Sequence, residues 1–363
     1  MALAPRMRVQ LLSKYGRLGA SSRIRSYQYV PHLVARGAEI TTVPLLDDGY
    51  LRALYGGWRY PMARVVRSFA RRLRYLCKVH RFDLVWVEYE LFPWCPSIVE
   101  RALSAFGIGF VVDYDDAVFH RYDESSSRVV RALLGHKIPS IMRRARAVIA
   151  GNEYLERWAT EHGARRVELI PSVVDTKCYV PRHRSKTDEF RIGWIGSPTT
   201  ARYLQLVRGA LERLTSMPEV TIVLIGPGKN TLDGVRSVVC KWQESTEVES
   251  IQGLDVGIMP LPDDPWERGK CGYKLVQYMA CGIPVVASPV GANNRIVEHG
   301  TNGFLARRES DWVEALLLLK DNPELRACLG SAGRNRVMQH YSLDSAVPKL
   351  YNTLRTAAGL EAR

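Results

Sequence analysis

The sequence predicts an α/β protein of two facing Rossmann-like domains, each a parallel sheet covered by helices. Strand-like and helix-like segments alternate along the whole chain, which is typical of parallel α/β layers. The 363 residues are too many for one comfortable hydrophobic core, and they suit two domains of roughly 150–200 residues each. Residues 181–189 are polar, lack an apolar period and are predicted to be the linker between the domains.

The strand-like segments form two series on either side of that linker. The first series comprises residues 8–12, 39–43, 84–88, 109–113, 147–150 and 167–170, and the second comprises 190–195, 220–225, 256–259, 284–287 and 303–305. We therefore expect an N-terminal domain over 1–180 and a C-terminal domain over 190–342. Residues 343–363 are expected to form a final helix, whose apolar spacing leaves open whether it packs on either domain or crosses back to the N-terminal one.

Composition indicates an ordinary globular protein, with 46% hydrophobic and 24% charged residues. No window reaches the roughly 18 apolar residues that a membrane span requires, and the N-terminus has no secretion signal. The seven cysteines are scattered and form no CxxC pair, which favours reduced thiols over disulfides or a zinc site. We expect a cytoplasmic protein, with attachment to the inner face of the membrane left open.

Positive charge is concentrated in the first half of the chain. Through residue 185 there are 30 Lys and Arg against 17 Asp and Glu, whereas the remainder has 21 against 20. The first part therefore carries a net charge of +13 and the second +1, out of +14 in total. Such a field attracts polyanions, namely nucleic acid, anionic lipid or a phosphorylated substrate.

Residues 269–288 contain the most informative motif, a Gly- and Lys-containing loop followed by a helix, a glycine stop and a buried strand. Gly269 and Gly272 let a ligand approach the backbone at the helix start, where free N–H groups and the dipole favour phosphate. Lys270 and Lys274 add positive charge on the same helical turn. An ordinary crossover with solvated lysines remains the alternative for this motif.

These residues resemble the signature of glycosyltransferase family 4. Within the block, Ala280, Gly282, Pro284, Val285 and Ala287 match the family's "E-A-M-A-x-G-x-P-V-(V/I)-A". The segments 254–261, 296–305 and 170–175 resemble further family blocks in the correct order. The resemblance implies a GT-B fold with the active site in the interdomain cleft, a nucleotide-sugar donor and retention of anomeric configuration. It also implies that no cofactor or obligatory metal is needed.

The donor site implied by the resemblance departs from the family pattern in two places. The family's paired glutamates fall on Gly269 and Gln277, and Gln277 can still hydrogen-bond ribose hydroxyls without offering charge. The first loop of the C-terminal domain also lacks the family's Arg and Lys. We therefore assign the diphosphate countercharge to the two lysines. The expected donor-binding residues are Gly196, Ser197, Thr199, Lys270, Gly272, Tyr273, Lys274 and Gln277, although Ser197 and Thr199 could equally be helix N-caps.

The first half offers a glycine loop and a group of carboxylates at the ends of predicted strands. Gly16, Gly19 and Arg23 follow the first strand, and the resemblance implies that this loop approaches the diphosphate or the acceptor. Asp115 and Asp116 follow another strand, where ligands bind in α/β proteins. We expect these two residues to be catalytic, orienting an acceptor or donor hydroxyl, with a helix N-cap as the alternative for Asp116.

Three further features of the first half have competing interpretations. Asp113 and Asp115 spell a DxD pair that binds metal in transferases of another fold, but we expect no metal because the nucleotide site is assigned to the other domain. His120 could titrate near neutrality, although a lone histidine is usually structural. From 61 to 81 apolar residues alternate with arginines, and residues 128–146 are also basic. Either these are core-facing helices with solvated basic backs, or they dock on anionic membrane.

The sequence therefore predicts a glycosyltransferase that moves a hexose from a nucleoside diphosphate sugar to an acceptor hydroxyl in glycan or cell-envelope polysaccharide synthesis. The expected acceptor is a glycan or a lipid-linked glycan. The rival enzyme is a nucleotide-sugar epimerase or hydrolase on the same fold. A non-catalytic basic nucleic-acid-binding protein is the second rival, but no recognition module is visible and the basic helices lack interleaved aromatics.

Overall fold

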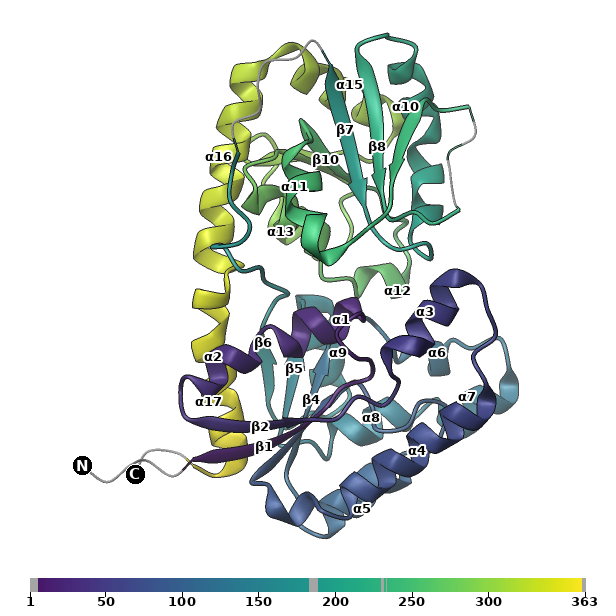
Figure 1. The fold of residues 1–363 in the computed structure, drawn as a ribbon, viewed down its shortest axis with the longest axis vertical. Coiled ribbons are helices and arrows are strands. Elements are labelled where there is room, and N and C mark those ends of the chain that lie inside the picture. The colour runs from purple at the N-terminus through teal and green to yellow at the C-terminus, as the bar shows by residue number, and fades with distance from the viewer. Residues whose placement is uncertain (1–5, 183–188, 230–231, 233, 361–363) are drawn as a thin grey trace, which may run out of the picture. The chain divides into compact units, whose positions relative to one another are not determined.

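The computed structural model describes residues 6–182, 189–229, 232 and 234–360 of the chain (Figure 1). The chain divides into two compact units. Unit 1 comprises Met1–Ser172 together with Ala346–Arg363, and unit 2 comprises Val173–Ser345. Most of the linker predicted at 181–189, namely residues 183–188, lies outside the described residues. Each unit is a parallel α/β sheet flanked by helices, so the predicted fold class is confirmed.

Unit 1 contains a six-stranded parallel sheet with the order β2-β1-β3-β4-β5-β6. Its strands are β1 (Met7–Leu12), β2 (Ala38–Thr42), β3 (Leu84–Glu88), β4 (Phe110–Tyr114), β5 (Ala147–Ala150) and β6 (Val167–Leu169). The inner strands β3, β4 and β5 are buried along their whole length, as expected where helices cover both faces of a sheet. The chain leaves β1 first toward β2 and then returns to β3 on the other side. The topological switch point therefore lies between β1 and β3.

The helices of unit 1 connect these strands. They are α1 (Ala20–Ser22), the π-helical turn η1 (Arg23–Tyr27), α2 (Val30–Val34), α3 (Asp48–Gly56), α4 (Met62–Leu76), η2 (Val79–Arg81), α5 (Ile98–Ala105), α6 (His120–Asp123), α7 (Arg128–Leu134), α8 (Lys137–Met142) and α9 (Glu153–Glu161). The last helix, α17 (Leu343–Ala358), contributes its later turns to this unit. Two hydrogen bonds join α17 to other segments of unit 1. Arg146 Nη1 donates to Ala357 O of α17 at 2.6 Å, and Tyr351 Oη of α17 donates to Arg36 O at 2.8 Å.

Unit 2 contains a second six-stranded parallel sheet, with the order β12-β11-β10-β7-β8-β9. The strands are β7 (Phe190–Ile195), β8 (Val220–Ile225), β9 (Ser237–Cys240), β10 (Val256–Met259), β11 (Val285–Ala287) and β12 (Gly303–Leu305). The chain runs from β7 to β8 and β9 on one side and then crosses to β10 on the other. The switch point of this sheet therefore lies between β7 and β10.

The helices of unit 2 bury the two faces of this sheet. They are η3 (Ala201–Val207), α10 (Arg208–Thr215), η4 (Glu244–Thr246), α11 (Glu247–Gln252), α12 (Pro265–Arg268), α13 (Tyr273–Ala280), α14 (Asn293–Ile296), α15 (Glu309–Asp321) and α16 (Pro323–His340). One hydrophobic cluster joins α10 and α15 to the sheet, and the other joins α13 to it. Within the described ranges no helix is long and apolar enough to cross a membrane.

Helix α4 presents a different face to the core from the one its sequence indicates. The apolar residues Met62, Val66 and Leu73 are 72%, 63% and 48% exposed, whereas Arg72 is 1% exposed. The Arg72 guanidinium donates hydrogen bonds to Ser13 O and to Val43 O. The interpretation of α4 as a core-facing helix with a solvated basic back therefore holds only in part. Leu76 is buried, Phe69 is half-buried against Phe92 and the other arginines of α4 are exposed, but Arg72 lies in the interior.

Candidate functional site

The first candidate site lies at the switch point of unit 2, where the carboxyl ends of β7 and β10 are adjacent. Ligands of open α/β sheets bind at this position because the loops that follow the two neighbouring strands lead away on opposite faces. The loop after β7 begins at Gly196, and the chain that follows β10 leads to α12 and then to the start of α13. These two segments carry all the residues predicted to bind a donor.

Hydroxyl groups organise the loop after β7. Ser197 Oγ lies 2.8 Å from Thr199 Oγ1 and 3.3 Å from Thr200 Oγ1, and Thr200 Oγ1 receives the Ser197 N–H at 3.2 Å. A side chain at Gly196 would place its Cβ 2.5 Å from the Trp194 ring, so the absence of a side chain is required there. The N-cap of η3 is Thr200, which makes no side-chain capping bond. The predicted N-cap roles of Ser197 and Thr199 are therefore wrong.

Two lysines flank the start of α13. Gly272 adopts a left-handed φ of 65°, and a Cβ there would lie 2.3 Å from Ile296 Cδ1. This conformation turns the chain into α13 at Tyr273, which is half-buried like both lysines. Lys270 Nζ lies 6.0 Å from the centre of the Tyr203 ring, and Lys274 Nζ lies 5.5 Å from that of Trp194. Both cations therefore lie over aromatic faces beside the start of a helix, where backbone N–H groups point outward.

Tyr278 fixes α13 to the sheet. Its hydroxyl accepts a hydrogen bond from the Ile195 N–H at 2.8 Å, and its ring covers Gly257, where a Cβ would lie 2.3 Å from the ring. The last strand amide before the Gly196 loop is therefore paired with the helix that carries Lys274. The lysine and the loop are parts of one rigid arrangement, which suits a site that binds an anion by backbone and side-chain donors.

Gln277 lies in the interior behind this arrangement. Its Nε2 donates to Glu247 Oε1 at 2.8 Å and to Tyr179 Oη at 3.2 Å. Glu247 also accepts hydrogen bonds from the Tyr179 hydroxyl and from the Trp242 indole N–H. Both Gln277 and Glu247 are buried. The sequence singled out Gln277 as a donor-binding residue, but it contained no signal for its partners, which are 30 and 98 positions away.

The second candidate site lies at the switch point of unit 1, between β1 and β3. Glu88 ends β3 and is buried. Its Oε2 accepts the Lys14 N–H at 2.8 Å and the Ser22 hydroxyl at 2.6 Å, which ties the loop after β1 to β3. Burial raises the pKa of Glu88 to about 7, and the hydrogen bonds from Ser22 and Lys14 offset only part of that effect. A carboxyl group that can hold a proton near neutral pH therefore lies at this edge.

The predicted glycine loop surrounds a carboxylate. The Gly16 N–H donates to Leu46 O at 3.2 Å, and a Cβ at Gly16 would lie 2.4 Å from Asp48 Oδ1. Gly19 is the N-cap of α1, and a Cβ there would lie 2.5 Å from the Tyr15 Cβ. Arg23 begins η1, and its Nη1 lies 3.4 Å from Arg17 O. Both glycines therefore permit close packing of this loop.

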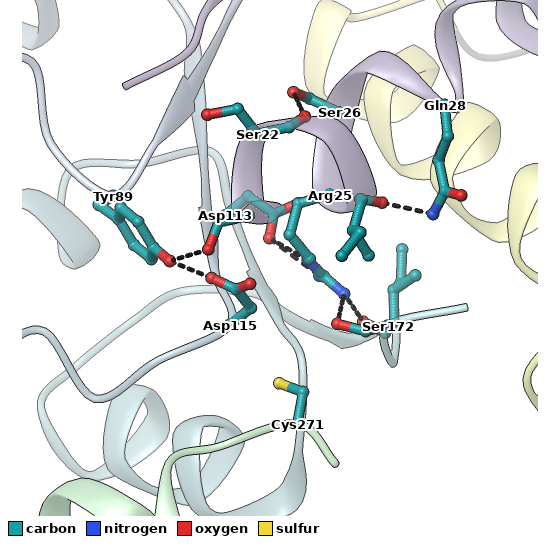
Figure 2. Close-up of polar contacts among 12 residues, drawn as sticks. Ser22, Arg25, Ser26, Gln28, Tyr89, Asp113, Asp115, Ser172 and Cys271 are labelled. Carbon is teal, nitrogen blue, oxygen red and sulfur yellow. Dashed lines mark hydrogen bonds and ion pairs between the residues drawn. The ribbon is translucent and has the colours of Figure 1, made fainter. Parts of the chain in front are cut away.

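Asp113 forms a buried ion pair at the end of β4. Arg25 donates from Nε to Asp113 Oδ1 at 2.9 Å, and its Nη1 donates to Ile170 O at 2.8 Å (Figure 2). Burial raises the pKa of Asp113 to about 6 despite the opposing effect of Arg25. Arg25 is itself buried, with its side chain 2% exposed. The carboxylate of Asp113 is thus committed to an arginine.

The predicted catalytic carboxylates follow directly. Asp115 Oδ1 accepts a hydrogen bond from the Tyr89 hydroxyl (Figure 2), and burial together with the neighbouring Asp116 raises the pKa of Asp115. Asp116 is half-buried. The helix-cap alternative for Asp116 is wrong, because α6 begins at His120 and its N-cap residue is Phe119. Two adjacent, half-buried carboxyl groups therefore lie at the ligand-binding edge of the sheet.

His120 is occupied locally. Its Nδ1 lies 3.0 Å from Asp123 Oδ1 and 3.3 Å from Glu124 Oε1, and its Nε2 lies 2.7 Å from the Tyr154 hydroxyl. These contacts agree with the structural role expected for a lone histidine. Four buried or half-buried groups at this edge were not predicted from the sequence, namely Glu88, Tyr89, Glu90 and Lys137. The sequence did contain one signal for this group, because Glu88 and Glu90 lie at the end of a predicted strand, where ligands bind in α/β proteins.

Comparison with known proteins finds glycosyltransferases similar to part of the chain. The family described as "Glycosyl transferases group 1" matches residues 189–322. The D-inositol 3-phosphate glycosyltransferase of Pseudarthrobacter chlorophenolicus is 34% identical over 47% of this chain and 46% of its own length. The GDP-mannose-dependent monoacylated alpha-(1-6)-phosphatidylinositol monomannoside mannosyltransferase of Corynebacterium glutamicum is 25% identical over 56% and 60%. The chain thus matches about half the length of these curated relatives.

Solved structures with the same fold cover nearly the whole chain. Sucrose-phosphate synthase from Thermosynechococcus elongatus superposes with a TM-score of 0.75 at 16% identity, covering 98% of this chain and 100% of its own. Anabaena HepE, solved in complex with UDP-glucose, gives 0.71 at 16% identity, covering 96% and 100%. These structures share the GT-B arrangement of two Rossmann-like domains. Residues 189–322 are thus similar to the group 1 glycosyltransferases, and the chain has the GT-B fold of two Rossmann-like domains.

Proposed function

We propose that the chain transfers a hexosyl group from a nucleoside diphosphate sugar to an acceptor hydroxyl, with retention of anomeric configuration. The observation that carries the proposal is the pair Lys270 and Lys274 at the glycine-flanked start of α13, at the switch point of unit 2. Among the relatives, HepE was solved with UDP-glucose and the corynebacterial mannosyltransferase is GDP-mannose-dependent. Both names fit a site built for a diphosphate.

The proposed chemistry depends on stabilising the leaving diphosphate. Negative charge develops on its oxygens as the bond to the sugar breaks, and fixed cations and helix-end N–H groups stabilise such charge without reorganising. Lys270, Lys274 and the N–H groups around Gly196 and Tyr273 have this role in our proposal. The diphosphate oxygen then accepts the proton of the attacking hydroxyl. Asp115 and Asp116 orient a sugar hydroxyl, and Gln277 holds the donor ribose in place.

The acceptor domain in this proposal is unit 1, with Gly16, Gly19 and Arg23 near the diphosphate or the acceptor. We propose a lipid-linked or otherwise anionic acceptor, which fits the charge of +13 through residue 185. The two curated relatives are named for inositol 3-phosphate and a phosphatidylinositol mannoside, both of which carry phosphate. Attraction between a cationic unit and an anionic acceptor speeds encounter and weakens with salt.

Helix α4 supports docking of unit 1 on an anionic membrane surface. Its 15 residues contain arginines and no acidic side chain, and Met62, Val66 and Leu73 are exposed between them. Exposed apolar side chains beside cations are the features by which an amphipathic helix lies in a lipid interface. Each basic residue near such a surface contributes about 1 kcal/mol. The polar anchorage of Arg72 leaves the apolar side chains of α4 available for this contact.

The experiment that tests the proposed function separates transfer from its rivals. The purified chain is screened by thermal shift with UDP, GDP, ADP and their sugars, because a ligand at 100 times its Kd adds roughly 2.7 kcal/mol of stability. The stabilising nucleotide sugar is then incubated with and without acceptor lipids and glycans. We expect nucleoside diphosphate release to depend on acceptor. Equal release without acceptor would identify a hydrolase, and binding of DNA or RNA without nucleotide-sugar binding would identify the nucleic-acid rival.

A further inference from the structure

The loop after β3 contains two strained backbone positions. Tyr89 and Trp94 have φ angles of 61° and 64°, and within the described residues they are the non-glycine residues with positive φ. Glycine or asparagine is the usual residue at such a position, because other side chains strain the left-handed conformation. Such strain costs about 1–3 kcal/mol per residue and persists where surrounding structure enforces it. An observed outlier of this kind points to a function.

A buried ionic network enforces the conformation of this loop. Glu90 is 4% exposed and accepts hydrogen bonds from the Tyr122 hydroxyl at 2.9 Å and from Lys137 Nζ. Lys137, itself 3% exposed, also donates to Phe92 O at 2.7 Å. The Leu91 N–H donates to the carboxylate of Glu100 at 2.9 Å. The loop is therefore held from inside at three successive positions.

Trp94 is the large side chain that this network turns outward. Its N–H donates to the Tyr122 hydroxyl at 3.1 Å, and its ring contacts the Tyr122 ring edge to face at 5.4 Å. The tryptophan nevertheless remains 57% exposed. The same tyrosine hydroxyl thus joins the buried glutamate to the backbone of the exposed tryptophan. Packing within the protein does not explain an indole at a strained position in solvent. The conformation is explained if a ligand covers the indole.

The position and surroundings of Trp94 indicate the chemistry of that ligand. The loop follows the carboxyl end of β3, the edge at which α/β sheets bind ligands and at which Asp115 lies. The face of an indole is electron-rich and the C–H bonds of a pyranose ring carry partial positive charge, so the two stack.

We propose that Trp94 is the stacking platform for a pyranose ring of the acceptor. This assignment rests on the proposed function for the identity of the ligand as acceptor, and it makes the acceptor a saccharide rather than a bare lipid headgroup. The buried Glu90–Lys137 pair and Tyr122 act as positioning groups, because they hold the indole at its angle before the ligand arrives. Such preorganisation reduces the entropy lost on binding.

The test measures saccharide binding without donor, so that it does not depend on transfer. Methyl α- and β-pyranosides of glucose, galactose, mannose and N-acetylglucosamine are screened against the chain by saturation-transfer difference NMR, and Kd is determined for those that bind. We expect Trp94→Gly to weaken binding about tenfold, equivalent to roughly 1.4 kcal/mol, and Trp94→Phe to weaken it less than threefold. We also expect Trp94→Gly to raise the thermal midpoint, since glycine relieves the strain at φ 64°.

Phe106→Ala provides the matched control. Phe106 is 81% exposed, but it follows α5 and precedes β4, so it lies at the amino edge of the same sheet. This variant should bind pyranosides as the wild type does. The proposal is overturned if no pyranoside binds the wild type, or if Trp94→Gly and Phe106→Ala bind equally. Loss of anionic vesicle binding by Trp94→Gly with unchanged pyranoside affinity would assign the indole to lipid instead. Failure of acceptor-dependent transfer with this pattern intact would refute the proposed function alone.

Discussion

The guanidinium of Arg25 and the carboxylate of Asp113 form an ion pair of 2.9 Å in the interior of unit 1, with side chains 2% and 3% exposed. Arg25 comes from η1 and Asp113 from the end of β4, so the pair joins the segment after β1 to the middle of the sheet. Attraction between buried charges is strong because little water screens it, but each charge depends on its partner. Removal of one partner should therefore destabilise the folded chain.

Arg25→Met should destabilise the fold by about 3–5 kcal/mol, because Asp113 is left as an uncompensated buried carboxylate. Urea unfolding of the wild type and the variant measures the free energy of unfolding. Arg8→Met is the control, since Arg8 lies 3.0 Å from Asp83 but is half-exposed, and exposed pairs contribute little. Equal losses for the two variants would show that burial does not set the contribution of the Arg25–Asp113 pair.

Glu88 should make stability depend on pH. Its pKa is raised from 4.5 to about 7 in the folded chain, so the folded state favours the protonated carboxyl. Stability from this group is fully present below pH 4.5 and is lost as pH rises through 7. Glu88→Gln should therefore gain relative to the wild type by about 3 kcal/mol between pH 4.5 and 8. Unfolding at a series of pH values measures the difference, and a constant difference would show that the pKa is not raised.

Lys274→Ala should weaken binding of nucleoside diphosphate by about tenfold to a hundredfold, since one charge-assisted contact contributes roughly 1.5–3 kcal/mol. Binding of the nucleoside should be unchanged, because it lacks the phosphates. Calorimetry with UDP and uridine, or with the base selected in the screen, measures both. Lys320→Ala is the control, since Lys320 contacts Glu219 before β8, at the opposite edge of the sheet. Equal, small effects of Lys274→Ala on both ligands would remove this lysine from the site.

Transfer should survive chelation. Arg25 occupies the carboxylate of Asp113, and Tyr89 donates to Asp115, so the two residues of the DxD pair are already bonded to protein groups. Turnover in excess EDTA should equal turnover in buffer. Complete loss of turnover in EDTA with recovery in manganese would instead show that transfer requires a metal, and loss of that recovery in Asp115→Asn would make the DxD pair its ligands.

The chain should sediment with anionic vesicles at low salt through the exposed face of α4 in unit 1. Arg67 and Arg74 are exposed on α4, and their replacement by Glu should reduce binding, by about 1 kcal/mol for each cation lost. Arg71 is left unchanged, because its Nη2 donates to Pro44 O and Leu45 O at 3.2 Å. Binding should also fade between 0.1 M and 1 M salt, as the Debye length falls from roughly 10 Å to 3 Å.

The control for vesicle binding changes two exposed arginines of unit 2, Arg213 and Arg307, to Glu. This variant carries the same charge change in the part of the chain that is nearly neutral, so it should sediment like the wild type. If the wild type ignores anionic vesicles at low salt, or if the α4 variant binds as well as the wild type, the exposed face of α4 has no membrane role.

Local sequence patterns predicted the strands because buried parallel strands are continuous apolar runs. All eleven expected strands are present within a residue or so of their predicted ends, and β9 was missed. Its residues Val238 and Val239 are 52% and 45% exposed at the edge of the sheet. The segment therefore lacks the continuous apolar run that identifies a buried strand. The loop-helix-strand motif at Lys270 could be predicted for the same reason, since its parts are adjacent in the chain.

Contacts between distant segments could not be predicted. Glu88 and Lys14 are 74 positions apart, and the bond between them depends on which strands become neighbours. Arg72 reads as one of several surface arginines in α4 and differs from them only because Ser13 O and Val43 O lie beneath it. Periodicity measures hydrophobicity, so it assigned the apolar side of this helix to the core. Arg72, which satisfies buried carbonyl groups, turns the helix so that Leu76 and Phe69 still face the interior whereas Met62, Val66 and Leu73 are exposed.

The anchorage of α4 has a consequence for its amide hydrogens. The helix meets the rest of unit 1 through the buried Ser68, Arg72 and Leu76 and through the half-buried Phe69 on Phe92. Lifting it away therefore breaks the Arg72 hydrogen bonds and exposes only part of its apolar side chains, because Met62, Val66 and Leu73 are already exposed. Amide exchange in α4 should therefore occur through a local opening whose free energy hardly depends on denaturant. The buried side of α13, which packs on the sheet through Leu275, Val276 and Met279, can open only with the sheet beneath it, so its amides should exchange through global unfolding. Two helices that pack on sheets of the same architecture should therefore exchange their amide hydrogens by different mechanisms, α4 by local opening and α13 by global unfolding.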